Sequence, residues 1–308
     1  MNFSTLQGLT IPEGVVTQIA DASGRVLWKL ETSKPVVLEV ARITSDTYAG
    51  ETTYTGEQFI LLDIYPKTNG TVKVTYGGLT KTITDTSGVE EPNAQKVFFG
   101  TFNGVSDSVA TPASGELTIE GNYYAFGCGH FKESSAQKTD AAVCKCITAV
   151  TDMGAVTQIP ADAFYNCFKA TVKNVPSSIV LHVPEGVTKI GTYAFRATFE
   201  SSVSNIQIIE STTGLKEIVL PSSILSIGSS AFEAYMPSSG MVEEASKSNV
   251  LNFKILATTP PTIIAADYNN IFGDYYGDGS IIVPKGCGEA YKAAAGWSIY
   301  ADYIVEAS

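Results

Sequence analysis

The sequence has few of the residues on which many binding and catalytic chemistries depend. It contains two histidines, and its 20 lysine and arginine residues are outnumbered by 31 acidic residues, which gives a formal net charge of −11. An acidic surface repels phosphate backbones and anionic lipid headgroups, so we expect no nucleic-acid partner. No run approaches the roughly 18 apolar residues that a membrane-spanning helix needs, so we expect no membrane insertion either.

The N-terminal stretch also lacks the features of a secretion signal. Residues 1–16 read MNFSTLQGLTIPEGVV, without a basic segment followed by an apolar one. We therefore expect no signal peptide in this sequence. Either a leader has been removed, or the protein is not exported by that route.

Cysteine is also scarce, with five residues in the chain. Because this number is odd and the residues are scattered over a long chain, they do not resemble a disulfide framework. One pattern could supply four zinc ligands, namely CGH at 128–130 with CKC at 144–146: Cys128, His130, Cys144 and Cys146. Each pair has one intervening residue, whereas zinc motifs usually have two to four. We favour buried thiols or a local disulfide, and we expect no metal and no other cofactor.

Catalytic motifs are absent as well. The sequence has no G-x-S-x-G nucleophile elbow, and His182 in VLHVP is interpreted as an outward-facing strand residue. The loop NNIFGDYYGDGS at 269–280, with Asp274 and Asp278, does not fit the calcium-binding pattern and is interpreted as a turn. We expect no catalytic residues and no enzymatic activity.

The residues that are present favour β structure. Apolar residues make up 44% of the chain and charged residues only 17%. Residues 1–30 predict a small β-hairpin unit around the turn DASGR. Residues 31–126 contain β-rich runs bounded by turn signals, which predicts an immunoglobulin-like β-sandwich without the paired cysteines of antibody domains. The polar residues 127–141 are interpreted as a linker.

The second half contains a repeat. Three segments share one pattern: MGAVTQIPADAF from Met153, PEGVTKIGTYAF from Pro184 and PSSILSIGSSAF from Pro221. Counted from these first residues, +3 and +6 are Val or Ile, +7 is Gly in two copies, and +10 and +11 are Ala-Phe in all three. Such self-similarity indicates a solenoid.

The repeated positions predict a common core. We expect +3, +6 and the phenylalanine at +11 to point inward, and the glycine at +7 to let the chain bend back. Proline should end the strand that precedes each repeat. A degenerate fourth copy is aligned from Pro261, which places Ile264 at +3 and Ile271 and Phe272 at +10 and +11, although Asp267 occupies +6. A fifth start at Pro284 keeps only the strand and the proline.

The pattern L..I.LP.S...IG..AF resembles the BspA-like leucine-rich repeats of gut bacteria. The segment IIVPKGCGEAYKAAAGWSIYADYI also resembles the usual C-terminal segment of that family, so the resemblance covers about residues 140–308. It implies a leucine-rich-repeat solenoid over 142–283 and a C-terminal cap over 284–308. The first repeat departs from the family at Met153, where the family has proline. The predicted fold class is therefore mainly β, a β-sandwich followed by a capped solenoid.

The resemblance also implies a function. It points to a non-catalytic binding or adhesion protein, extracellular or on the surface of a gut bacterium, with host proteins, matrix or other microbes as partners. Residues 9–30, LTIPEGVVTQIADASGRVLWKL, faintly resemble N-terminal modules of gut-phage structural proteins. The alternative is therefore a structural protein of a phage virion, and an enzyme ranks last.

Strand alternation predicts a binding face in the repeats. Reading back from Pro184, Pro221 and Pro284, alternate residues share a face. We assign Val183 and Leu220 to the core. The opposite face would contact a protein or glycan partner through four residues: His182, Glu217, Val219 and Ile282.

Aromatic residues crowd the C-terminal part of the chain. They are Tyr268, Phe272, Tyr275, Tyr276, Tyr291, Trp297, Tyr300 and Tyr303. Exposed aromatic rings could stack on sugars, but the open end of a solenoid requires a hydrophobic cover. We interpret this group as that cover.

Overall fold

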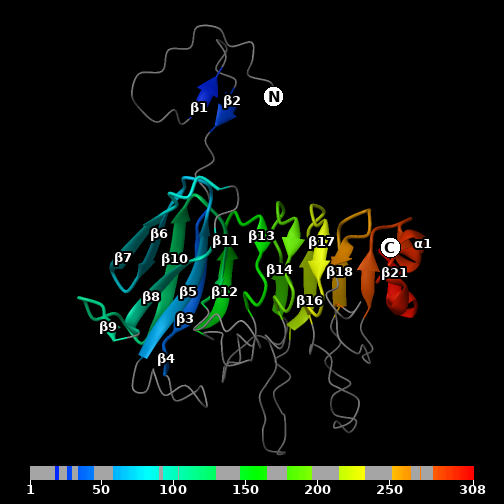
Figure 1. Cartoon of the computed structure of the whole chain (residues 1–308). Helices are drawn as coiled ribbons and strands as arrows, with labels where there is room; N and C mark the ends of the chain where they lie inside the picture. The colour runs from blue at the N-terminus through cyan, green and yellow to red at the C-terminus, as the bar shows by residue number, and fades with distance from the viewer. Residues whose placement is uncertain are drawn as a thin grey trace, which may run out of the picture.

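The computed structural model is mainly β, as expected, with the helical segments α1 (Gly288–Ala293) and η6 (Ser298–Tyr303) near the C-terminus. We call residues 36–153 the antiparallel region and residues 156–306 the repeat region, and the strands of the second follow those of the first in Figure 1. The structure describes residues 18–20, 26–29, 34–44, 58–89, 93–102, 104–129, 146–164, 179–195, 215–232, 252–264, 271 and 280–308.

The N-terminal residues include a short pair of strands. Strands β1 (Gln18–Ala20) and β2 (Val26–Lys29) pair antiparallel, with Ile19 opposite Trp28. This pairing agrees with the predicted hairpin. The turn residues 21–25 between the two strands lie outside the described residues.

The antiparallel region consists of two sheets. The first has the order β12-β3-β10-β6-β7, and the second has the order β11-β5-β8-β9, with β4 also paired to β5. The first sheet comprises β3 (Val36–Ala41), β6 (Thr71–Tyr76), β7 (Leu79–Thr84), β10 (Ser114–Gly121) and β12 (Ile147–Met153). The second comprises β4 (Ile43–Thr44), β5 (Gln58–Pro66), β8 (Gln95–Phe102), β9 (Val105–Ser106) and β11 (Tyr123–Cys128).

The two antiparallel sheets pack face to face. Tyr76 of β6 and Phe99 of β8 are fully buried, and their ring centroids lie 5.5 Å apart in an edge-on contact. Edge-on packing of aromatic rings is favourable beyond the area that the rings bury. The two sheets therefore share one interior.

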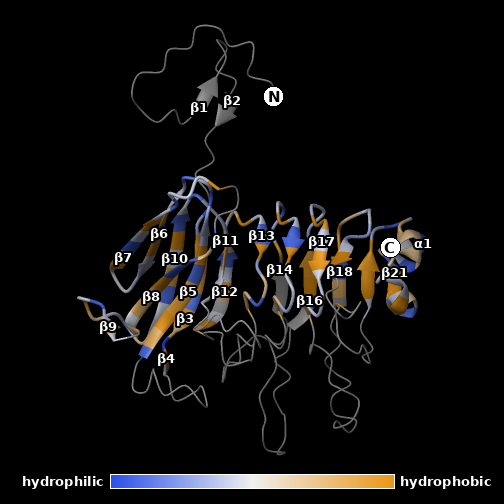
Figure 2. Ribbon diagram, in the orientation of Figure 1, coloured by the Kyte–Doolittle hydropathy of each residue, from blue (hydrophilic) through white to orange (hydrophobic). Residues whose placement is uncertain are grey.

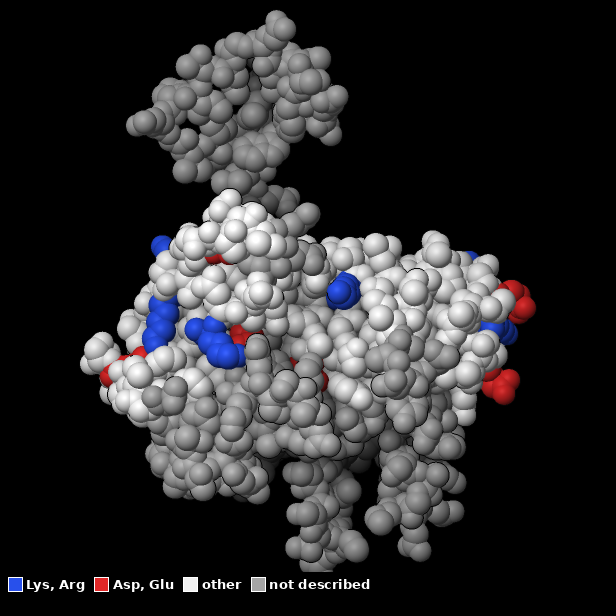
Figure 3. Space-filling view, in the orientation of Figure 1, with Lys and Arg blue, Asp and Glu red and all other residues white. Residues whose placement is uncertain are grey.

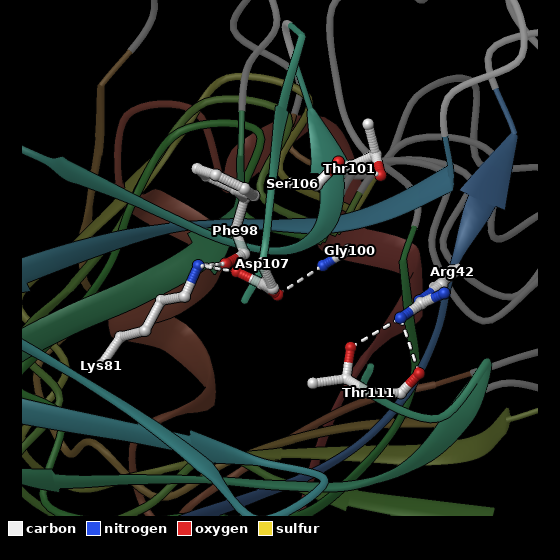
Figure 4. A network of polar contacts seen from close by, with 8 residues as sticks. All are labelled: Arg42, Lys81, Phe98, Gly100, Thr101, Ser106, Asp107 and Thr111. Atoms are coloured by element: carbon white, nitrogen blue, oxygen red, sulfur yellow. Dashed lines mark hydrogen bonds and ion pairs between the residues drawn. The ribbon is translucent and has the colours of Figure 1, made fainter. Parts of the chain in front are cut away.

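A lysine joins the sheets at their open edge (Figure 4). The Nζ atom of Lys81, on the edge strand β7, lies 2.6 Å from Oδ1 of Asp107 and also donates a hydrogen bond to the carbonyl oxygen of Phe98. It lies 4.0 Å from the ring centroid of Phe98, and the other oxygen of Asp107 accepts a 2.7 Å hydrogen bond from the Gly100 amide. A charge that points inward from an edge strand discourages pairing with another chain.

The repeat region consists of two parallel sheets. One has the order β13-β15-β17-β19, and the other has the order β14-β16-β18-β20-β21. The first comprises β13 (Gln158–Ile159), β15 (Lys189–Ile190), β17 (Ser226–Gly228) and β19 (Thr262–Ile264). The second comprises β14 (Ile179–His182), β16 (Leu215–Leu220), β18 (Asn252–Ile255), β20 (Ile281–Val283) and β21 (Ile304–Glu306).

A stack of phenylalanines fills the space between these sheets. Phe164, Phe195 and Phe232, at position +11 of the three repeats, are fully buried, and successive ring centroids lie 5.2 and 5.4 Å apart. Phe126 of β11 extends the stack at one end and Phe253 of β18 at the other, at 5.7 and 5.3 Å. Figure 2 shows hydrophobic residues along β16, β17 and β18 beside this core. The inward positions of +3, +6 and +11 in the three repeats are confirmed.

The glycine at +7 has a different role from the one predicted. The φ angles of Gly191 and Gly228 lie outside the left-handed region, so these residues do not make the bend. A Cβ atom on Gly191 would lie 2.3 Å from the backbone nitrogen of Ala161, and one on Gly228 would lie 2.3 Å from that of Thr192. Glycine is therefore required because neighbouring repeats approach each other closely there.

The bend lies two residues later, at position +9. In all three repeats this residue has a left-handed backbone although it is not glycine, with φ angles of 57°, 55° and 52° for Asp162, Tyr193 and Ser230. This conformation costs energy for a residue with a Cβ atom. The repeat thus contains a strained position that the sequence pattern did not show.

The alignment of the fourth copy was wrong at its start. Its later part agrees with the structure, because Ile271 at +10 is fully buried and accepts a 2.9 Å hydrogen bond from the Phe232 amide, as Ala231 accepts one of 2.8 Å from Phe195. Ile263, not Ile264, pairs with Ile227, which is the +6 residue of the third repeat. Ile264 is 47% exposed, so it does not point inward as its assigned +3 position required. The register of a parallel sheet is set by the hydrogen bonds between its strands. In the fourth copy, these bonds place the strand at a different distance from Pro261 than the alignment assumed.

Strand β11 joins the two regions. The Tyr124 carbonyl accepts a 2.9 Å hydrogen bond from the Thr157 amide, just as the Thr157 carbonyl accepts one of 2.9 Å from Thr188. The Cys128 amide likewise donates a 2.7 Å hydrogen bond to the Ala163 carbonyl. Strand β11 therefore occupies the place of a preceding repeat and covers the first end of the stack.

Strand β12 belongs to the first sheet of the antiparallel region. Although it falls within residues 142–283, it pairs antiparallel with β3, and Val150 lies opposite Leu38. Residues 130–145, which include most of the predicted linker, lie outside the described residues. The division of the chain into domains stays a prediction.

Three C-terminal aromatic residues cover the other end of the stack. Tyr291 and Trp297 are fully buried, with ring centroids 5.2 Å apart, and Tyr300 is 2% exposed. Trp297 Nε1 donates a 2.8 Å hydrogen bond to the Pro261 carbonyl, and the Tyr291 hydroxyl donates one of 2.8 Å to that of Ala257. These contacts agree with the predicted hydrophobic cover. Four others of the group lie outside the described residues, namely Tyr268, Phe272, Tyr275 and Tyr276.

We expect Phe195→Ala to lower the free energy of unfolding by about 3–5 kcal/mol, because it leaves a cavity between two stacked rings. Urea denaturation measures the change. The control is Leu225→Ala in the third repeat, where the side chain is 67% exposed and the expected change is within about 0.5 kcal/mol. A loss below about 1 kcal/mol for Phe195→Ala contradicts its role in the core.

Deletion of residues 284–308 should cause aggregation, because it uncovers the apolar end of the stack. Light scattering after size-exclusion chromatography detects the aggregates. Ile299→Ala on η6, where the side chain is 58% exposed, is the control and should leave the protein unchanged. A truncated chain that stays monomeric with an unaltered melting curve shows that the cover is dispensable.

Candidate interaction surface

One row of side chains crosses the outer face of the sheet β14-β16-β18-β20-β21. We call it the outer row, and its members pair in register from strand to strand: His182, Val219, Lys254, Ile282 and Val305. In-register pairing places cross-strand partners on the same face of a sheet. The structure thus brings three of the four predicted residues, His182, Val219 and Ile282, into one line.

The residues next to the outer row along each strand point into the core. Leu220 and Val183 are 0% and 4% exposed, as predicted. The same holds for the inward residues of the other strands, which are all at most 4% exposed: Ile218, Phe253, Ile255, Ile281, Val283 and Ile304. This alternation means that the outer row faces away from the phenylalanine stack.

Members of the outer row differ in exposure. His182 is exposed, Val305 is 44% exposed, and Lys254 and Ile282 are half-buried. Val219 is only 8% exposed, so it offers less surface than strand alternation suggested. The fourth predicted residue, Glu217, lies in the neighbouring row on the same face and is half-buried.

Sequence reasoning missed Lys254 and Val305. No proline directly follows β18, so the motif NFKI at 252–255 is not aligned with the other strands by this rule. Its alternation was nevertheless visible, because Phe253 and Ile255 are apolar and Lys254 is not. Val305 was missed because β21 lies in the C-terminal segment, which was interpreted as a cap.

The outer row combines apolar and basic groups. Apolar residues stand on both sides of Lys254 in the row, and the exposed His182 lies at one end. By contrast, the corresponding row of the other parallel sheet is polar throughout: Gln158, Lys189, Ser226 and Thr262. In the view of Figure 3, the described surface of the repeat region carries few charged groups: one basic group stands near the middle of the molecule, and the others lie at the C-terminal end.

Carboxylates hold neighbouring turns together. Both oxygens of Glu185 accept 3.0 Å hydrogen bonds from Ser222, one from its amide and one from its hydroxyl. The amide bond is the main reason that the pKa of Glu185 is lowered. Glu306 likewise accepts bonds of 2.9 and 2.8 Å from the Gly286 and Gly288 amides, which lower its pKa.

The structure places two of the possible zinc ligands. Cys128 and Cys146 are fully buried, whereas His130 and Cys144 lie outside the described residues. In the described part of the chain, no three His, Cys, Asp or Glu side chains gather closely enough to hold a metal ion. The loop with Asp274 and Asp278 is also outside the described residues. None of the described helices has the length and apolar character needed to cross a bilayer.

Comparison with known families identifies the repeat type. Residues 142–239 match the family model of the BspA type leucine rich repeat region, in six copies. The chain thus carries BspA-type leucine-rich repeats within a mainly β structure. Parallel strands β18, β20 and β21 continue the pattern beyond the matched residues. A search of curated proteins finds no match to the chain.

The hydrogen bonds of Glu185 predict a pH-dependent effect. Because the pKa of Glu185 is lowered on folding, its contribution is complete above the unfolded-state pKa and is lost as the pH falls through the folded-state value. We expect Glu185→Gln to destabilise the protein at pH 7 and to have little effect near pH 3, measured by urea denaturation. Glu289→Gln, at a side chain that is 93% exposed, is the control. Equal losses at both pH values would exclude the carboxylate charge as the cause.

Proposed function

We propose that the protein is a non-catalytic binding or adhesion protein that contacts its partner through the outer row. Repeats of the matched type generally mediate protein binding. The observation that carries the proposal is the alignment of five side chains from five strands on one face. Because the backbones of these strands are paired within the sheet, a partner would contact this face through its side chains.

The chemistry of the outer row favours a protein partner over a glycan. The row contains no Phe, Tyr or Trp ring on which a sugar could stack. Its apolar members, Ile282 and Val305, instead offer area to apolar side chains, and Lys254 between Val219 and Ile282 offers a charge to a carboxylate. Because the sheet is fixed by backbone hydrogen bonds, binding needs little ordering of this surface.

We further propose the domain organisation that the sequence predicted. Residues 1–30 form a hairpin unit, 31–126 an immunoglobulin-like sandwich, 127–141 a linker, 142–283 a solenoid and 284–308 a cap. Two facing antiparallel sheets support the sandwich, and two parallel sheets around a phenylalanine stack support the solenoid.

The proposed location is outside the cell or on the surface of a gut bacterium. Proteins with repeats of this type are typically extracellular, which supports the proposal. A structural protein of a phage virion is the alternative.

Glutamate substitutions on the outer row test this function. The chain is screened by biolayer interferometry against immobilised matrix proteins, microbial surface proteins and glycans. For a protein that binds, we expect His182→Glu and Lys254→Glu each to weaken affinity about tenfold or more, without a change in melting temperature, because both face the partner.

The matched control is Lys189→Glu, which makes the same charge change as Lys254→Glu on the other parallel sheet. It should leave the affinity unchanged. If both outer-row variants bind normally while substitutions in the antiparallel region abolish binding, the repeat region is a stalk and the proposal is wrong.

A further inference from the structure

Two cysteines lie in the core where the antiparallel region meets the repeat region. Cys128 is the last residue of β11, and Cys146 directly precedes β12. Both side chains are fully buried, and both are thiols in this structure. They belong to different sheets, because β11 is part of the second antiparallel sheet and β12 of the first.

A single carbonyl oxygen brings the two segments together. The backbone oxygen of Leu61, on β5, accepts a 2.9 Å hydrogen bond from the amide of Gly129, the residue after Cys128. The same oxygen accepts a hydrogen bond from the Cys146 thiol, whose Sγ atom lies 3.3 Å away. The sulfur of Cys146 and the backbone next to Cys128 are therefore neighbours around one atom.

The side chain of Cys128 points into the gap between the two sheets. Cys128 lies opposite Leu62 on β5, and Ile60, two residues before Leu62, lies opposite Phe99. These residues share one face of the second sheet, because cross-strand partners and alternate residues point the same way. Phe99 contacts Tyr76 of the first sheet, so this face is the inner one.

Cys146 connects the first sheet to the second. Its carbonyl oxygen accepts a 2.9 Å hydrogen bond from the Ala41 amide at the end of β3, which fixes its backbone in that sheet. Its sulfur nevertheless reaches Leu61 of the second sheet. The sulfur of Cys146 thus contacts the backbone of the sheet that carries Cys128.

We propose that Cys128 and Cys146 form a disulfide between the two sheets when the chain folds in the presence of a small-molecule disulfide. Each thiol loses a proton, and the pair gives two electrons to the oxidant. With oxidised glutathione, the sulfur–sulfur bond of glutathione breaks, two glutathione thiols form, and the protein gains one disulfide.

The disulfide would close the segment 129–145 and fix the strand on which the first repeat stacks. Constraining a loop of this length reduces the freedom of the unfolded chain, and burial shields the bond from reductants. The proposal does not depend on the proposed function, because it needs only the packing of the two sheets and an oxidant.

Peptide mapping of the full-length protein tests the proposal. The chain is refolded with reduced and oxidised glutathione, remaining thiols are alkylated under denaturing conditions, and proteolytic fragments are analysed by mass spectrometry without reduction. We expect one fragment that links Cys128 to Cys146 and disappears on reduction. We also expect the oxidised protein to melt about 5 °C higher than the reduced protein.

Variants distinguish this link from others. Cys287→Ser, at a half-buried thiol near α1, should keep both the linked fragment and the melting difference. Cys128→Ser and Cys146→Ser should each abolish them. The proposal is overturned if both cysteines are alkylated in the oxidised wild-type protein, or if either is linked to Cys144, Cys167 or Cys287 instead.

Discussion

The stacking of one phenylalanine from each repeat against the next is the interaction on which the structure depends. A single repeat cannot bury its own ring, because each face of the ring needs a neighbour. The stack of Phe126, Phe164, Phe195, Phe232 and Phe253 therefore requires a cover at each end. The antiparallel region covers the first end through β11, and the buried aromatic residues of the C-terminal segment cover the other. The two regions thus share one core.

The same stacking sets the backbone geometry and the binding surface. Rings just over 5 Å apart bring neighbouring backbones so close that only glycine fits at Gly191 and Gly228. The chain then bends at the +9 residue at the cost of a left-handed conformation. Because the strands on the other side pair in register, every second residue is turned away from the core, and the outer row results. The phenylalanine stack and the outer row therefore both follow from the regular stacking of one repeat on the next.

Part of the candidate surface was accessible to sequence reasoning. Where a proline marks the end of the strand, as at Pro184, Pro221 and Pro284, counting back gave the correct face for His182, Val219 and Ile282. Without such a marker the reasoning missed Lys254 and Val305, and it misplaced Ile264 in the fourth copy. The low exposure of Val219 could not be predicted either, because strand alternation shows which face a side chain is on and not how much of it is accessible.

The sequence by itself determined the mainly β character, the spacing of the repeats and the residues of the common core, because these follow from local pattern and hydrophobicity. Only the tertiary structure decided how the two halves meet. Strand β12 pairs with β3, more than a hundred residues earlier, and β11 donates to Ala163 of the first repeat. Such pairings depend on which backbone groups face each other in space, and no local pattern in Cys128 or Cys146 records that they share a neighbour in Leu61.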